Sequence, residues 1–201
     1  MYVKVCGLTD PATVDVAVDA GADAIGVVMN QTSARAVDAD TARTIVDRAA
    51  GRVETVLVVN DMPAVDAARI AADLAFSVLQ LHGSYTADDF ATAAEVFGRL
   101  WRATSLANDP PLQVGAYGEE SLLLDAARPG SGERWDLSVL AESGVSGRWL
   151  LAGGLSPTNV ADAIGQARPW GVDTSSGIES SPGVKDHVKV RDFIVAAKSA
   201  G

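Results

Sequence analysis

Two residues suited to acid–base chemistry stand at the ends of short apolar runs in this sequence. Cys6 follows Tyr-Val-Lys-Val, and Asp125 ends a Leu-Leu-Leu run. A thiol beside a cation such as Lys4 can lose its proton and act as a base. A carboxyl group at the end of a buried strand is costly unless it is hydrogen-bonded or kept protonated, and a protonated one can act as an acid. Plain burial of Cys6 and helix capping by Asp125 are the structural alternatives.

Two glycine- and serine-rich turns predict an anion site. Gly153 and Gly154 lie between an apolar run and a helical pattern, and Asp173 is followed closely by Ser175 and Ser176. Backbone N–H groups at such turns, together with a helix N-terminus, bind phosphate in many barrel proteins. Glycines that only permit tight turns are the alternative. The occurrence of both turns after consecutive apolar runs favours the anion site.

Arg35 and His82 complete the candidate site. Arg35 follows the second apolar run, where its guanidinium could bind a substrate carboxylate in a fork; a solvated arginine is the alternative. His82 ends another run, and a structural role is as consistent with its position as a catalytic one. Because Cys6 is the only cysteine and the chain has two histidines, the sequence predicts neither a disulfide nor a zinc site.

Short apolar runs alternate with longer amphipathic segments along the chain, and they predict the elements that position these residues. The expected strands are Tyr2–Cys6, Ala24–Met29, Val53–Val59, Ser77–Leu81, Leu100–Ser105, Ser121–Asp125, Trp149–Ala152 and Gly171–Thr174. The expected helices are Pro11–Ala20, Ala39–Ala50, Pro63–Asp73, Ala87–Phe97, Leu137–Ser143, Pro157–Ala167 and Val188–Lys198. The segment Asn108–Tyr117 is either a loop or one short helical turn.

This alternation predicts the fold class. Asp10 and Ser156 each precede a proline at a first helical position, and Gly21 and Gly51 suit left-handed helix ends. The strands are apolar throughout, as in a parallel sheet buried on both faces. We therefore expect α/β architecture with a single closed (β/α)8 TIM barrel over residues 1–201 and short loops. An open doubly wound sheet is disfavoured, because Cys-Gly-Leu-Thr replaces its glycine-rich first turn.

Composition limits the partners. The 201 residues are 48% apolar and 21% charged, and 16 Lys and Arg against 26 Asp and Glu give a net charge of −10. With no basic cluster, a nucleic-acid or anionic-membrane partner is disfavoured. No apolar run approaches the roughly 18 residues that span a bilayer, and the N-terminus has no secretion pattern. We expect a cytoplasmic protein without a metal.

Several segments together resemble a known family, phosphoribosylanthranilate isomerase of tryptophan biosynthesis. They run between residues 3 and 186 in the family's order: KVCGLT, GADAIGVVMNQTSAR, LQLHG, LLLD, GSG, LAGGLSPTNV and GVDTSSGIESSPGVKD. The first and last of these are specific as a pair. The resemblance implies a cofactor-free Amadori rearrangement of N-(5-phosphoribosyl)anthranilate to the 1-deoxyribulose phosphate isomer.

The resemblance also implies roles for the candidate residues. Asp125 would be the general acid that opens the ribose ring, and Cys6 the general base at C2′. Arg35 would bind the anthranilate carboxylate. The full expected substrate-binding set is Lys4, Arg35, His82, Gly153, Gly154, Asp173, Ser175 and Ser176. The expected partner is one small phosphorylated substrate, handled by a monomer or a homodimer.

The sequence departs from the family in two loops. Aromatic and proline residues are missing before Arg35, although Ser33 keeps its spacing, and Glu133-Arg134 follow the Gly-Ser-Gly turn at 130–132. Two rival functions remain. The related sugar isomerase of histidine biosynthesis is disfavoured, because the first half lacks a second Gly-Gly turn and Cys6 replaces an aspartate. A non-catalytic barrel that binds a phosphorylated ligand is disfavoured by the presence of both Cys6 and Asp125.

Overall fold

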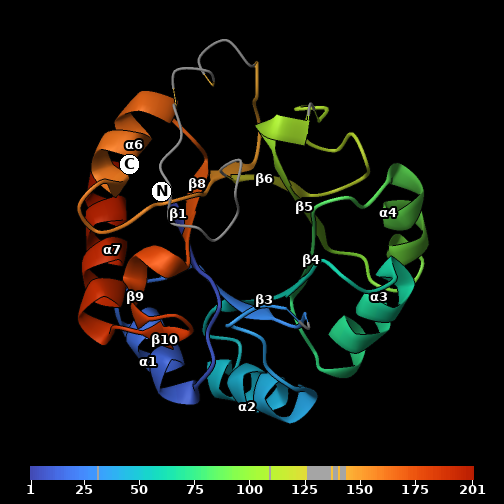
Figure 1. The fold of residues 1–201 in the computed structure, drawn as a ribbon, viewed down its shortest axis with the longest axis horizontal. Coiled ribbons are helices and arrows are strands. Elements are labelled where there is room, and N and C mark those ends of the chain that lie inside the picture. The colour runs from blue at the N-terminus through green and yellow to red at the C-terminus, as the bar shows by residue number, and fades with distance from the viewer. Residues whose placement is uncertain (31, 109, 126–136, 138–139, 141–143) are drawn as a thin grey trace.

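A computed structural model describes residues 1–30, 32–108, 110–125, 137, 140 and 144–201. Eight parallel strands form a closed ring, with the helices around its outside (Figure 1). Their bounds are β1 (Tyr2–Val5), β2 (Ala24–Val28), β3 (Glu54–Val59), β4 (Val78–His82), β5 (Leu100–Ser105), β6 (Ser121–Asp125), β7 (Trp149–Leu151) and β8 (Gly171–Thr174). Pairing of β8 with β1 closes the ring. The expected barrel is confirmed, and the alternative of an open doubly wound sheet is wrong.

The described residues form six α-helices, most of them close to their expected bounds. They are α1 (Pro11–Asp19), α2 (Ala39–Ala49), α3 (Ala64–Asp73), α4 (Ala87–Ala94), α6 (Val160–Ala167) and α7 (His187–Ala200). A 3-10 turn, η1 (Leu106–Asn108), ends at Asn108, the first residue of the ambiguous segment, and residues 110–117 have no helix. The helix expected at 137–143 and the Gly-Ser-Gly turn at 130–132 lie outside the described residues.

The helix ends test the capping predictions. Asp10 caps α1, and its side chain accepts a hydrogen bond from the Thr13 N–H at 2.9 Å. Gly21 and Gly51 have left-handed backbones, with φ of 92° and 72°. The expectation that Ser156 caps a helix at residue 157 is wrong, because α6 starts at Val160. The intervening residues form a turn, which the site uses.

Side chains of the barrel strands divide into an inner and an outer layer. Lys4 and Cys6 face inward, and Val3 and Val5 face the helices, as strand alternation predicts. The inner apolar cluster is small: Cys6, Ala24, Val28, Val56, Val58, Val78, Trp101, Ala103, Leu123, Leu150 and Ala152. The outer cluster is larger and joins strands to helices. Inward-facing residues at the carboxyl ends of the strands are therefore held by a rigid, packed wall.

One element was not expected from the sequence. After η2 (Ser176–Ile178), the chain forms a short antiparallel hairpin of β9 (Glu179–Ser181) and β10 (Val184–Lys185). In Figure 1 the hairpin lies next to α1 and α7, at the edge of the barrel. Among the described residues, no helix has the length and apolar character needed to cross a membrane.

Candidate active site

A cavity of about 340 Å³, the main cavity of the site, opens at the carboxyl ends of the strands. Six of the predicted site residues line it: Cys6, Arg35, His82, Asp125, Asp173 and Ser175. A smaller cavity shares the last three of these and adds Gly153, Gly154 and Ser176. Nine of the ten predicted residues thus line two neighbouring cavities that share three residues, and the larger of the two has the size of a small-ligand site. Lys4, the tenth, is fully buried and lines neither cavity.

Cys6 lies directly after β1, and its side chain is only 7% exposed. Burial raises the pKa of the Cys6 thiol, and the neighbouring cations Lys4 and Lys185 act in the lowering direction without cancelling the rise. The cationic influence expected from the sequence is present, but desolvation outweighs it. In the protein without substrate, Cys6 is therefore a thiol at neutral pH.

Gly26, on β2, makes room for the Cys6 thiol. A Cβ atom on Gly26 would lie 2.6 Å from the Cys6 sulfur and 3.1 Å from its Cα atom. Both distances are shorter than van der Waals contact, so any side chain here would displace Cys6. A glycine at an interior strand position marks such a close approach.

Gly26→Ala should therefore lower kcat by roughly 10- to 100-fold, because a small misplacement of a reacting group costs about that much. Turnover and a thermal melt of the purified variant would check this. Gly165→Ala is the matched control, since a Cβ on that α6 glycine meets nothing within 4 Å. Normal turnover by a folded Gly26→Ala protein would show that the position of Cys6 is not critical.

Lys4 and Asp173 form a buried ion pair beneath the cavity. The Lys4 Nζ atom lies 3.0 Å from the Asp173 Oδ1 atom, and the lysine side chain is fully buried. Burial alone would lower the pKa of Lys4, but the neighbouring acidic groups Asp173 and Cys6 outweigh it and raise that pKa. Lys4 therefore neutralises a carboxylate that would otherwise repel an anionic ligand. Direct substrate binding by Lys4 stays a prediction.

Asp125 ends β6, beside Ser105 of β5, and is 8% exposed. It lines both the larger and the smaller cavity. Its carboxyl group therefore faces the junction between them, so one ligand that fills both cavities passes this residue. That position suits proton transfer to the middle of an elongated substrate.

His82 ends β4 at the cavity wall. Burial, with a smaller effect of the Lys4 charge, lowers the pKa of His82 to about 4. The imidazole is neutral at physiological pH, so it can offer one N–H donor and one acceptor but no charge. His82 is thus suited to hydrogen bonding with a substrate and not to binding its phosphate or carboxylate as a cation.

The lowered pKa of His82 makes stability depend on pH. Between pH 6.5 and about 4, the unfolded chain takes up a proton at this histidine and the folded chain does not. The free energy of unfolding should therefore fall by roughly 3 kcal/mol as the pH falls through this interval. Denaturant titrations of the wild type and His82→Gln, both from pH 7 to 4, would isolate this contribution. Identical pH profiles would contradict it.

The smaller cavity lies between the loop after β7 and the end of β8, which are joined by a hydrogen bond. Gly153 and Gly154 have left-handed backbones, with φ of 87° and 66°, and their N–H groups donate to no acceptor among the described residues. Thr174 donates its hydroxyl to the Leu155 carbonyl at 2.7 Å, which joins the loop after β7 to β8. Available amide groups on turns of fixed geometry form an anion cradle.

Asn159 holds the shape of this cradle. Its side-chain oxygen accepts from the Ser156 N–H at 2.7 Å, and its amide donates to the Gly154 carbonyl at 2.8 Å. These bonds keep residues 156–159 in a turn, which is why α6 begins later than expected. The cradle consists mainly of loop amides, because α6 begins only at Val160.

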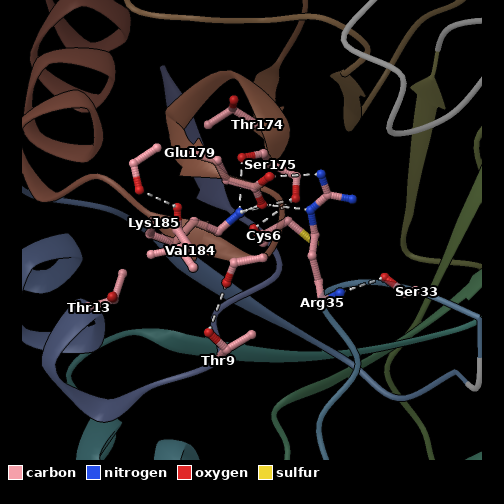
Figure 2. A network of polar contacts seen from close by, with 12 residues as sticks. Cys6, Thr9, Thr13, Ser33, Arg35, Thr174, Ser175, Glu179, Val184 and Lys185 are labelled. Atoms are coloured by element: carbon pink, nitrogen blue, oxygen red, sulfur yellow. Dashed lines mark hydrogen bonds and ion pairs between the residues drawn. The ribbon is translucent and has the colours of Figure 1, made fainter.

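Arg35 reaches the cavity from the loop after β2. The Asn30 side chain accepts from the Ser33 N–H at 2.8 Å, and the Ser33 hydroxyl oxygen accepts from the Arg35 N–H at 3.1 Å. The Arg35 guanidinium forms a fork with the Glu179 carboxylate: Nε donates to Oε1 at 2.7 Å and Nη2 donates to Oε2 at 3.0 Å (Figure 2). Glu179 raises the pKa of Arg35, which stays cationic.

Four residues shape the site without a role that is predicted from the sequence. Glu179 and Lys185 form the charged network around Arg35, Asn159 holds the anion cradle, and Gln80 lines the main cavity. The Gln80 side-chain oxygen is buried and unpaired among the described residues, which makes it an acceptor for a ligand hydroxyl. The only available signal was the spacing of Glu179 and Lys185 around a Pro-Gly turn. Within the described part of the chain, no cluster of three potential metal ligands occurs.

An eight-stranded barrel with a thiol, a carboxyl group and an anion cradle at one end belongs to the class of barrel enzymes that act on small phosphorylated molecules. The model of the N-(5'-phosphoribosyl)anthranilate isomerase family matches residues 3–196. The chain belongs to this family, and the expected isomerase of tryptophan biosynthesis is confirmed.

Individual relatives agree with this assignment. The isomerase of Trichlorobacter lovleyi is 39% identical, with 98% of each chain covered. The crystal structure of TrpF from Jonesia denitrificans is 54% identical, with a TM-score of 0.93 over 100% of this chain and 98% of that one. A third structure, a phosphoribosyl anthranilate isomerase in complex with reduced 1-(o-carboxyphenylamino)-1-deoxyribulose 5-phosphate, is 30% identical. Its TM-score is 0.87 over 99% of each chain.

Proposed function

We propose that this chain converts N-(5-phosphoribosyl)anthranilate to 1-(2-carboxyphenylamino)-1-deoxyribulose 5-phosphate, with Asp125 as general acid and Cys6 as general base. The observation that carries the proposal is the placement of both residues on one cavity, which shares three lining residues with the anion cradle. A sugar phosphate that occupies the cradle would extend past Asp125 towards Cys6. Arg35, on the wall of the main cavity, would bind the carboxylate at the other end.

The reaction needs only proton transfers. Asp125 protonates the ring oxygen, the bond from that oxygen to C1′ breaks, and the nitrogen lone pair forms an iminium. The thiolate form of Cys6, which is the minor form at neutral pH, then removes the C2′ proton, and those electrons form an enolamine and neutralise the nitrogen. A final tautomerisation moves the hydroxyl proton to C1′ and leaves the ketone. The iminium acidifies the C2′ proton, so a modest base is sufficient.

Binding of the two anionic ends follows from local charge and not from the net charge of −10. Arg35 supplies the fixed cation for the carboxylate. The amide groups of Gly153 and Gly154 bind the phosphate, and the Lys4–Asp173 ion pair keeps the cradle from carrying a bare carboxylate. Gln80 and neutral His82 hydrogen-bond the ribose hydroxyl groups between the two ends.

A fluorescence assay tests the proposal. Freshly prepared phosphoribosylanthranilate would be mixed with purified protein in buffer that contains a chelator, and the loss of the anthranilate signal would be followed. We expect fast decay that depends on enzyme concentration. Tight binding of the reduced product analogue without any decay would instead identify a non-catalytic barrel. Decay of the histidine-pathway substrate alone would favour the related sugar isomerase.

Location and assembly belong to the same proposal. We expect a cytoplasmic enzyme that binds one small phosphorylated substrate and acts as a monomer or a homodimer. Sedimentation of the purified protein at assay concentration, with and without product analogue, would separate the two oligomeric states. A change in sedimentation on ligand addition would show that assembly and substrate binding are linked.

A further inference from the structure

The β9–β10 hairpin is fixed to the loops that carry Cys6 and Arg35. At its turn, Gly183 has φ of 82°, and its carbonyl accepts from the Thr9 hydroxyl at 3.1 Å. A Cβ on Gly183 would lie 2.4 Å from the carbonyl oxygen of Ala34, next to Arg35. The hairpin is therefore in close contact with the loops after β1 and β2, and its residues can set the geometry of both.

Two buried charges project from this hairpin. The Lys185 Nζ atom donates to Glu179 Oε1 at 2.8 Å and to the Ser175 carbonyl at 2.9 Å (Figure 2). The Glu179 side chain is 6% exposed and that of Lys185 is fully buried. Ser175 in turn donates its hydroxyl to the Cys6 carbonyl at 3.1 Å. One lysine thus links Glu179 to the segment that holds the base and the cradle.

The charges of this cluster do not cancel. Arg35 and Lys185 are cations, and Glu179 is the carboxylate between them. The trio carries one excess positive charge in a largely buried place. Uncompensated charge of this kind is costly, so a bound anion at this position is stabilising.

The fork of Glu179 uses one edge of the Arg35 guanidinium, through Nε and Nη2. A guanidinium has five N–H donors in one plane, so the second edge, Nη1 with Nη2, can bind a second carboxylate in the same manner. Among the described residues, that edge has no carboxylate partner, and Arg35 lines the main cavity. An arginine whose plane is fixed before binding loses less entropy when it binds.

We propose that Glu179, fixed by Lys185, is a positioning residue that orients Arg35 so that its second edge binds the aryl carboxylate of the substrate. This inference rests on the proposed function, since it explains how the carboxylate end is recognised. It assigns a specificity role to a residue that does not itself touch the substrate. Lys185 serves both anionic ends of the site, because it also holds the Ser175 backbone.

Two product analogues, both reduced at the ketone, would test this role. One carries the ring carboxylate, and the other is its phenylamino counterpart without it. Wild type should prefer the first by roughly 10- to 100-fold, the range of a charge-assisted hydrogen-bonded pair. Glu179→Gln should lose most of this preference and bind the second analogue as wild type does. Ser181→Ala, at an exposed position on the same hairpin, is the matched control and should keep the full preference.

Other outcomes overturn one proposal or the other. If Glu179→Gln weakens both analogues equally, its role is structural and the inference fails. If wild type binds both analogues equally, Arg35 does not recognise the carboxylate, and the inference about Glu179 falls with it. If wild type binds neither analogue, the proposed function is wrong. Should Glu179→Gln not fold, Glu179→Asp keeps the charge and shortens the fork, and unchanged preference in it overturns the inference. In an Arg35→Met background, Glu179→Gln should have no further effect on the preference.

Discussion

Replacing Cys6 with alanine is expected to lower kcat by about 10²- to 10⁴-fold, the range that a positioned general base contributes. The thiol lies on the main cavity with Gly26 behind it and Lys4 beneath it, and no other cysteine exists in the 201 residues. Affinity for the reduced product analogue should change little, because the proposed binding mode assigns both anionic ends of the substrate to other residues. Single-turnover assays and analogue titrations would measure the two effects separately.

The proposed role of Cys6 as general base also predicts that activity depends on pH, and it fixes the sign of that dependence. Because burial raises the pKa of Cys6, the thiolate fraction of the free enzyme increases with pH through a range above that of an exposed thiol. The value of kcat/KM, which reports the free enzyme, should rise along the same curve. Since Cys6 is the only cysteine, its rate of alkylation by iodoacetamide measures its thiolate fraction directly. The two curves should share one inflection; kcat/KM that is flat where alkylation rises would assign the base elsewhere.

The positions of the site residues could be predicted because a barrel converts sequence position into spatial position. Cys6, Asp125 and Asp173 lie on different strands, yet each lies at a carboxyl end, and the closed ring brings those ends together. Apolar runs and helix signals are local properties, so most of the predicted strand and helix ends lie within a few residues of the observed ones. Even the inward direction of Lys4 followed from alternation along β1 alone.

What the sequence could not predict depends on contacts between distant segments. The fork of Arg35 and Glu179 joins residues 144 positions apart, and no local pattern encodes it. Helix α6 starts later than predicted because the Asn159 side chain hydrogen-bonds to the backbone of Ser156 and Gly154, and these bonds compete with helix formation. The net direction of the Cys6 pKa required comparing burial with two lysines, and one of those, Lys185, belongs to the unexpected hairpin.

Asp125→Asn is expected to abolish ring opening and so to reduce turnover by at least about 10²-fold. Asparagine has nearly the same shape and can still hydrogen-bond, but it has no acidic proton to give to the ring oxygen. Asp125 lines both cavities, and in the proposed binding mode neither anionic end of the ligand depends on it. Affinity for the reduced product analogue should therefore stay within a few-fold of wild type.

A ring-opened substrate analogue makes this prediction specific. If Asp125 acts only before the iminium forms, a substrate that enters as the open Schiff base should be turned over by Asp125→Asn and not by Cys6→Ala. The two variants would then fail at successive steps of one reaction, since proton donation to oxygen precedes proton removal from carbon. Retention of most activity by Asp125→Asn on the closed substrate would contradict the assignment of Asp125 as the acid. The proton donor would then be another group in the cavity, and neutral His82 would be the first residue to substitute next.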